Sequence, residues 1–169
     1  ILKAQGRDIG IVLAHRPTAL TAPAAPVKLI GKGRMSMQWI TAYVSAAVAF
    51  GVLDALWLRW AAPNLYRPLI GELLAENFRM VPALVFYALY IAGMVWFAVR
   101  PGLEQGVPYG VLNGALLGAL CYATYDLTNQ ATLKVWSTQM TIIDIAWGAS
   151  ATALASGLAV FAVQKLTSQ

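Results

Sequence analysis

Charged residues are scarce in this sequence of 169 residues. Asp, Glu, Lys and Arg together make up 11 % of it, whereas hydrophobic residues make up 59 % and the mean hydropathy is +0.64. Soluble domains carry roughly a quarter charged residues, which keep their surface wetted. A chain of this length forms one domain, and we expect its outer surface to face lipid. The scarcity of charge argues against a soluble globular protein.

The residues that most often hold metals are nearly missing as well. The sequence has one cysteine, Cys121, and one histidine, His15. A single cysteine forms neither a disulfide within the chain nor a thiolate cage. Because His15 lies before the first long apolar run, haem, zinc or di-iron ligated by histidine inside a membrane is not expected. We expect no cofactor. Whether a hard cation binds to oxygen ligands stays open.

Basic residues are concentrated near the N-terminus, where the first 34 positions hold six of the twelve Lys and Arg residues. Residues 17–26 read PTALTAPAAP, which is typical of a loop or a polyproline conformation. Aromatic residues do not alternate with the basic ones, so nucleic acid is not expected as a partner, and anionic lipid head groups are. We interpret residues 1–34 as a basic tail rich in proline and alanine, an extension of a transmembrane domain formed by residues 35–169.

Four long apolar runs follow, at residues 39–58, 81–99, 107–127 and 140–163. Each is close to the ~20 residues that a helix needs to cross the hydrocarbon core. Aromatic and basic residues flank the runs, as interfacial anchors do. Residues 61–80 alternate leucines with charged residues, which predicts a short interfacial helix after the first span. The sequence therefore predicts an all-α integral membrane protein, a four-helix up-and-down bundle with both termini on one side.

Small residues recur at intervals of four in the last two runs. The third run holds Gly110, Gly114 and Gly118, and the fourth holds Gly148, Thr152 and Ser156. Small residues at this interval let two membrane helices approach closely. We expect the two stripes to face each other in the bundle. A ligand groove between them is the alternative.

Aspartates occur inside three of the four runs. Because the first and third runs cross in one direction and the fourth returns, all three carboxyl groups are predicted at a similar depth, below the face opposite the termini. A charged group inside a span costs roughly 2.5–3.5 kcal/mol, so we expect these groups to point into the bundle. Tryptophans follow two of the aspartates by one helical turn. The predicted intramembrane polar cluster comprises Asp54, Trp57, Asp126, Asn129, Asp144 and Trp147.

Two interpretations of this cluster stand side by side. In a structural role, the carboxylates pair with basic residues on the same face and with indole donors, and so fix the helix register; the basic candidates are Arg59, Arg67, Arg79 and Lys134. In a functional role, they hold a hard cation or relay protons. The sequence contains no Asp-rich signature of a membrane phosphotransferase or prenyltransferase, and it identifies no catalytic residue.

Five segments resemble a known family: VLDALWL, LYRPLIGELL, FYALYIAGMVWFAVRP, YATYDLTNQATLKVW and TIIDIAWG. Together they are similar to bacterial predicted membrane proteins with four spans, catalogued as a domain of unknown function. The resemblance covers roughly residues 37–163, and YDLTNQATL with the following Asp-x-x-Trp-Gly is its most specific part. The resemblance implies the fold and the membrane location. It implies no activity, substrate or cofactor.

The small size, the missing cofactor ligands and the small-residue faces favour a non-catalytic role. We expect an accessory or interaction subunit of a larger assembly in the bacterial inner (cytoplasmic) membrane, in contact with lipids and with a protein partner or a second copy of itself. Two alternatives stay open. One is a small transporter or an ion- or proton-binding protein that uses the aspartates, and the other is a lipid-modifying membrane enzyme.

Overall fold

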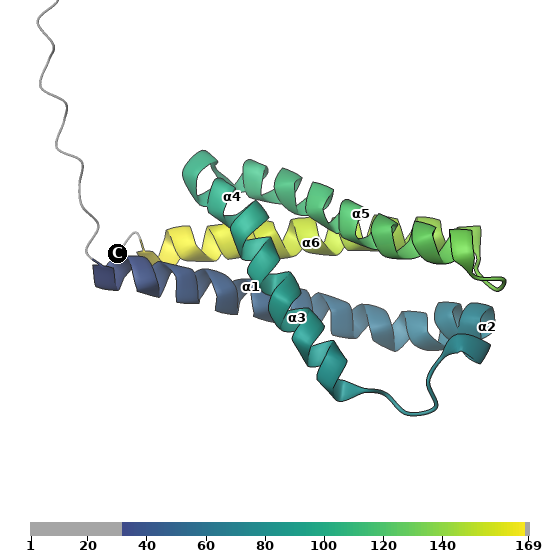
Figure 1. Cartoon of the computed structure of the whole chain (residues 1–169). Helices are drawn as coiled ribbons and strands as arrows, with labels where there is room; N and C mark the ends of the chain where they lie inside the picture. Colours follow the sequence, from purple (N-terminus) through teal and green to yellow (C-terminus); the bar gives the residue numbers. More distant parts are fainter. Residues whose placement is uncertain (1–31, 168–169) are drawn as a thin grey trace, which may run out of the picture. The chain divides into compact units, whose positions relative to one another are not determined.

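The computed structural model describes residues 32–167, with side chains for residues 37–166. Every regular element of this part is helical (Figure 1): α1 (Lys32–Ala61), a π-helical turn η1 (Ala62–Tyr66), α2 (Arg67–Ile70), a 3-10 turn η2 (Gly71–Leu73), α3 (Met80–Met94), a π-helical turn η3 (Val95–Val99), α4 (Arg100–Gln105), α5 (Val107–Thr132) and α6 (Thr138–Thr167). The predicted all-α fold with four long apolar helices is confirmed. Residues 1–31 of the predicted tail lie outside the described part, and residues 32–34 begin α1.

Four helical segments are long and apolar enough to cross a membrane, and each contains one of the predicted apolar runs. They are Met37–Leu73, Met80–Gln105, Val107–Thr132 and Thr138–Leu166. The first segment has 37 residues, many more than the ~20 that span hydrocarbon. Its last part, from η1 to η2, is therefore expected in the interfacial region. The predicted interfacial helix corresponds to this part and continues α1 without an intervening loop.

Both π-helical turns have the same cause in the sequence. Each ends immediately before an Arg-Pro pair, Arg67-Pro68 after η1 and Arg100-Pro101 after η3. The N–H of each arginine bonds to the carbonyl group five residues earlier. In an α-helix a proline ring clashes with the carbonyl group four residues earlier, and in both segments that residue lies within the π turn. The wider turn relieves this clash and shifts the register of the residues around it.

Helix α6 is the centre of the bundle. It packs along α5 on one side and α1 on the other, and η3 and α4 close the bundle against α5 (Figure 1). Half of the apolar window of α6 is buried, against 17–22 % for the other three segments. Its alanines at positions 151, 155 and 159 pack with Phe50 of α1 and Met94 of α3. The start of α1 and the end of α6 lie at the same end of the bundle (Figure 1), as an up-and-down order requires.

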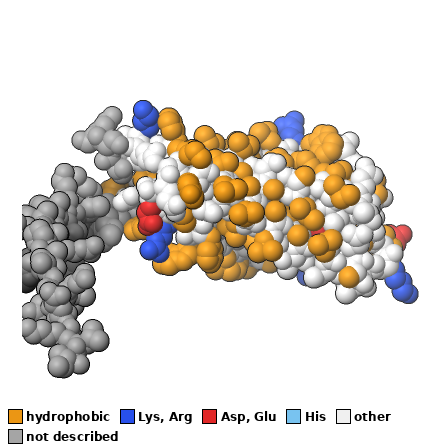
Figure 2. All heavy atoms as spheres, turned by 90° about the horizontal axis from the view of Figure 1, so that it is seen from above, with side chains coloured by type: hydrophobic (Ala, Val, Ile, Leu, Met, Phe, Trp, Pro, Cys, Tyr) orange, Lys and Arg blue, Asp and Glu red, His pale blue; other side chains and the backbone are white. Residues whose placement is uncertain are grey.

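Large hydrophobic side chains cover the outside of the bundle. Figure 2 shows one face on which hydrophobic side chains predominate and charged ones are few. Leu84 and Leu89 of α3, Leu120 of α5 and Leu158 of α6 are among the exposed residues. In water such a surface would be unfavourable, whereas in a bilayer it meets lipid chains. The exposed apolar surface and the four spanning segments together define an integral membrane protein.

Close contact between α5 and α6 depends on their small residues. A Cβ atom at Gly118 would overlap the backbone carbonyl group of Gly148, and one at Gly114 would lie 2.7 Å from the Thr152 carbonyl oxygen. The Gly148 Cα faces the ring of Tyr122, whereas Gly110 faces Val160 and α4. All six residues of the two predicted stripes are buried. The helices therefore meet backbone to backbone near the middle of α5.

Because of this contact, we expect even a methyl group at Gly118 to destabilise the protein. Gly118→Ala should lower the free energy of unfolding by about 1–3 kcal/mol, because a methyl group there forces the two backbones apart. The measurement is reversible unfolding in detergent, followed by tryptophan emission. Gly93→Ala is the matched control, since a Cβ atom at Gly93 of α3 would meet nothing within 4 Å. Equal stability of the two variants would show that α5 and α6 do not touch at Gly118.

Candidate functional site

Tyrosine hydroxyl groups contact two of the three intramembrane aspartates. Asp54 of α1 is 7 % exposed, and its carboxylate accepts a hydrogen bond from the Tyr87 hydroxyl of α3. Asp144 of α6 is 5 % exposed, and its Oδ1 accepts a hydrogen bond of 2.8 Å from the Tyr66 hydroxyl of η1. Tyr66 in turn accepts one of 3.0 Å from the Trp57 indole N–H. A chain of hydrogen bonds thus runs from α1 through η1 to α6.

The two predicted Asp-x-x-Trp segments meet through their tryptophans. The rings of Trp57 from α1 and Trp147 from α6 stack with their centroids 4.5 Å apart and their planes inclined by 7°. The stack lies beside the Tyr66–Asp144 hydrogen bond, because Trp57 also donates to Tyr66. The structure therefore brings Asp54, Trp57, Asp144 and Trp147 into one region between α1, α3 and α6.

Asp126 differs from the other two aspartates. It is fully buried on α5, and neither carboxyl oxygen has a hydrogen-bond partner within the described residues. A negative charge on Asp126 would be repelled by one on Asp144. Asn129, the other predicted residue on α5, is half-buried and forms no hydrogen bond to the three carboxyl groups in the described part of the chain. A buried carboxylate without a partner is strongly unfavourable.

The basic partners that the sequence suggests do not reach this region. Arg59, Arg67, Arg79 and Lys134 are all exposed. Among residues 37–166, the only ion pair joins Arg100 to Glu104 at 3.8 Å, within one helix and far along the chain from the three aspartates. Neither an arginine, a lysine nor an indole donates directly to the three carboxylates in this part; tyrosines do. The three carboxyl groups, which we call the acidic layer, therefore have no compensating protein cation within the described residues.

The three carboxylates also do not converge as one set of metal ligands. Over the described residues, no group of three or more Asp, Glu, His or Cys side chains is placed to hold a metal ion. Hard cations such as Mg²⁺ or Ca²⁺ need about six or more oxygen ligands in a compact shell. The arrangement is therefore better suited to a cation that needs one carboxylate than to one that needs three.

Asp144 lines a cavity of about 260 Å³, which we call the aromatic cavity. Its walls are Tyr66, Ile70, Leu74, Tyr122, Tyr125, Trp136, Met140 and Asp144. Asp144 is the only charged residue among them. The rings of Tyr125 and Trp136 meet edge to face, with centroids 5.7 Å apart and planes at 73°. Tyr125 and Leu74 are exposed, so the cavity is open on one side. It combines aromatic walls with one carboxylate.

A second cavity of about 320 Å³ adjoins the first, and we call it the adjoining cavity. It is lined by Phe86, Tyr90, Cys121, Tyr122 and Tyr125, from α3 and α5. Tyr122 and Tyr125 belong to both cavities. The Tyr90 hydroxyl is engaged with the Thr152 hydroxyl at 2.7 Å. Apolar and aromatic groups therefore dominate this second space.

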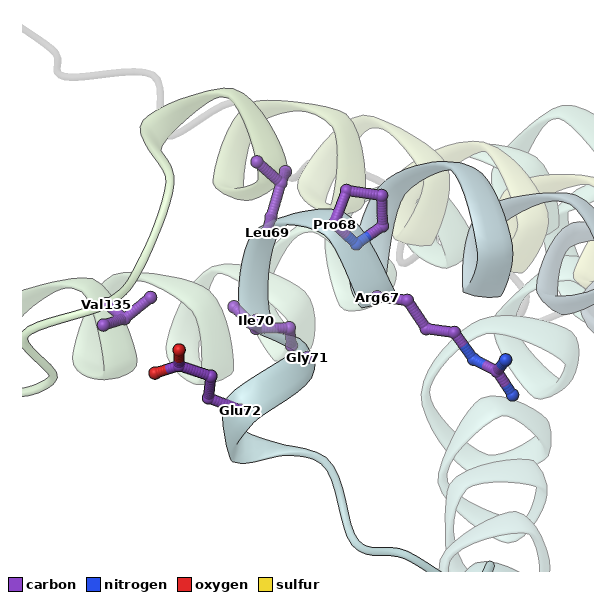
Figure 3. A pocket seen from close by; sticks show the side chains of 7 residues that line it. All are labelled: Arg67, Pro68, Leu69, Ile70, Gly71, Glu72 and Val135. Carbon is purple, nitrogen blue, oxygen red and sulfur yellow. The ribbon is translucent and has the colours of Figure 1, made fainter.

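A third hollow, of about 500 Å³, lies at the surface between α2, η2 and the loop from α5 to α6. Figure 3 shows four of its lining residues from α2 and η2, Arg67, Leu69, Ile70 and Glu72, together with Val135 of the loop. The Glu72 side chain lies on the side of Val135, whereas Arg67 points away (Figure 3). The hollow contains none of the predicted cluster residues, so it is not part of the acidic layer.

Tyr66, Tyr122 and Trp136 contribute to the site, yet none of them was predicted as part of the polar cluster. The sequence does contain a signal, since several tyrosines and tryptophans gather at the ends of the runs that hold the aspartates. Tyr66 is not predicted as a site residue because it lies in residues 61–80, whose alternating leucines and charged residues indicate an interfacial helix. Only the continuous helix through η1 turns its hydroxyl toward Asp144.

Comparison with known proteins supports the class that the fold defines. A family model described as "Predicted membrane protein (DUF2177)" matches residues 39–161, well over half of the chain. No curated protein and no solved structure matched the chain. The class is an integral membrane protein with four spans. The chain belongs to the DUF2177 family, whose function is unknown, and the family resemblance seen in the sequence is confirmed.

The hydrogen bonds of Tyr66 lead to a test of this geometry. Tyr66→Phe removes a donor to Asp144 and an acceptor for Trp57, so the free energy of unfolding should fall by about 1–3 kcal/mol. The control is Tyr43→Phe, which deletes an exposed hydrogen bond of 3.1 Å to the Ala88 carbonyl oxygen and should cost less than about 1 kcal/mol. Denaturant unfolding in detergent measures both. A loss no larger for Tyr66→Phe would contradict the hydrogen-bonded chain.

For Asp126, in contrast to Tyr66, we expect that substitution does not lower the free energy of unfolding. Asp126→Asn should leave the free energy of unfolding unchanged or raise it, because the change removes the repulsion with Asp144 and breaks no ion pair. The control is Glu104→Gln, which breaks an exposed ion pair and should change stability by less than about 1 kcal/mol. Thermal unfolding in the same detergent compares the two. A marked loss for Asp126→Asn would reveal an ionic partner and refute the uncompensated layer.

Proposed function

We propose that this protein is a small ion-binding or transport protein of the bacterial inner membrane, which takes a cation at its intramembrane carboxylates. One observation carries the proposal. Asp54, Asp126 and Asp144 lie inside the bundle, and over the described residues no arginine or lysine forms an ion pair with any of them. Within this part of the chain, a negative charge on these groups is therefore not neutralised by a basic side chain.

The physical argument concerns charge in a medium that solvates it poorly. Each ionised carboxylate inside a span costs a few kcal/mol, and neighbouring carboxylates such as Asp126 and Asp144 repel each other. A tyrosine hydroxyl satisfies one lone pair but does not neutralise the charge. A bound cation, or a proton, does. The site is thus more favourable when it is occupied by positive charge.

Asp144 is the acid best placed to meet a ligand. It lines the aromatic cavity, and only its Oδ1 is engaged by Tyr66. Asp126 is enclosed between the helices, and Asp54 is engaged by Tyr87. In this proposal Asp144 contacts the cation, while the other two carboxylates add negative potential.

The expectation of an accessory subunit receives less support from the geometry. It rested partly on faces of small residues that could dock a partner helix. Those faces are used within the chain, because Gly114 and Gly118 of α5 meet Gly148 and Thr152 of α6. We therefore place the cation-binding function first, and a partner chain is not required for it.

Cation titration tests the proposal directly. We expect saturable changes in tryptophan emission when the purified full chain in lipid nanodiscs is titrated with sodium, potassium or alkylammonium chloride, or with acid. Three tryptophans near Asp144 supply the signal: Trp57, Trp136 and Trp147. Asp144→Asn should weaken binding by at least about tenfold, equivalent to about 1.4 kcal/mol. Glu104→Gln should bind like the unchanged protein. A flat response to every cation and to protons would overturn the proposal.

A further inference from the structure

We propose that the cation held at Asp144 is an alkylated ammonium group, bound in the aromatic cavity. This inference rests on the proposed function and specifies the chemical class of the ligand. It depends on the walls of the cavity rather than on the acidic layer alone. Four of the eight lining residues are aromatic, three are aliphatic or thioether side chains, and one is the carboxylate.

The aromatic walls are held in place by contacts outside the cavity. The indole N–H of Trp136 donates a hydrogen bond of 3.1 Å to the Thr141 hydroxyl, which fixes the ring beside Tyr125. Tyr66 is held between Trp57 and Asp144. The Tyr122 ring packs on Gly148. A pocket whose rings are already held in position loses little conformational entropy when a ligand binds.

The chemistry of these walls discriminates between cations. Sodium, potassium and divalent ions exchange their water shell for several oxygen ligands, and the cavity offers few oxygen atoms beyond Asp144 and three phenolic hydroxyls. An alkylated ammonium group is weakly hydrated and is attracted to aromatic ring faces. One carboxylate beside four aromatic residues is the chemical complement of such a group. The aromatic cavity therefore favours an organic ammonium ion over an inorganic one.

The dimensions of the two cavities indicate the size of the ligand. Pockets for drug-sized molecules measure roughly 300–1,000 Å³, so 260 Å³ suits a compact head group. The adjoining cavity of about 320 Å³ shares Tyr122 and Tyr125 with it, so an alkyl substituent that passes between these two rings would enter the second space. A free alkylamine and the head group of a lipid have this chemistry in common.

The experiment uses the full chain in nanodiscs of phosphatidylglycerol, which carries no amine. Equilibrium dialysis with radiolabelled tetramethylammonium measures its binding, and potassium is titrated in parallel by tryptophan emission. We expect tetramethylammonium to bind at least about tenfold more tightly than potassium. Hexyltrimethylammonium should bind more tightly still if the adjoining cavity takes the alkyl chain. Asp144→Asn should weaken the binding of every cation.

Aromatic variants separate this inference from the proposed function. Trp136→Leu should weaken tetramethylammonium binding by at least about fivefold and leave potassium binding unchanged, whereas Trp136→Phe, which keeps a ring face, should restore most of it. Tyr109→Leu is the matched control, because Tyr109 is an exposed aromatic residue in the first turn of α5. Monodisperse size-exclusion profiles establish that the variants are folded. If Trp136→Leu does not fold, the comparison of Trp136→Phe with the unchanged protein still tests the inference.

Each outcome has a distinct meaning. Binding of potassium or protons without a preference for ammonium, unaffected by Trp136→Leu, would overturn the inference and leave the proposed function intact. Absence of any cation binding would overturn both. The source of the ligand follows from replacing phosphatidylglycerol with phosphatidylcholine. Reduced apparent affinity for tetramethylammonium then identifies a lipid head group, and unchanged affinity identifies a free amine.

Discussion

The backbone contact between α5 and α6 determines where the groups of the site lie. Because Gly118 and Gly148 have no side chains, the two helices approach until backbone meets backbone. This approach presses Tyr122 onto α6 and encloses Asp126 near Asp144. Helix α6 also contacts α1, so the same central helix aligns Trp147 with Trp57. A wider spacing of α5 and α6 would open the aromatic cavity and hydrate the acidic layer.

Tyrosine hydroxyl groups rather than basic side chains contact Asp54 and Asp144, and this difference gives the site its chemical character. An arginine beside Asp144 would neutralise it and fill the space next to it. Tyr66 and Tyr87 instead donate single hydrogen bonds and add aromatic surface. The result combines negative potential with apolar walls inside a lipid-facing bundle, where such a combination is costly unless positive charge binds.

Pro68 explains how the end of the first span contributes side chains to the site. Pro68 requires a wider helical turn before it, and that π turn contains Tyr66. The helix continues instead of breaking, so the predicted interfacial segment becomes a wall of the aromatic cavity and supplies Tyr66, Ile70 and Leu74. π-Helical turns are common at functional sites because they redirect a side chain without ending the helix.

The sequence by itself determined the number of spans and the all-α class, because hydropathy and helix length are local or additive properties. From chain direction it also predicted a common depth for the three aspartates. It also indicated the small-residue stripes, since their spacing follows the helical period. Only the tertiary structure decided which side chains meet. The partners of Asp54 and Asp144 come from other helices. The Arg-Pro pair accounts for the π turn that contains Tyr66, but it does not specify that the Tyr66 hydroxyl meets Asp144 of α6. The aromatic cavity likewise combines η1, α2, α5 and α6, whose relative rotation is set by packing across the bundle.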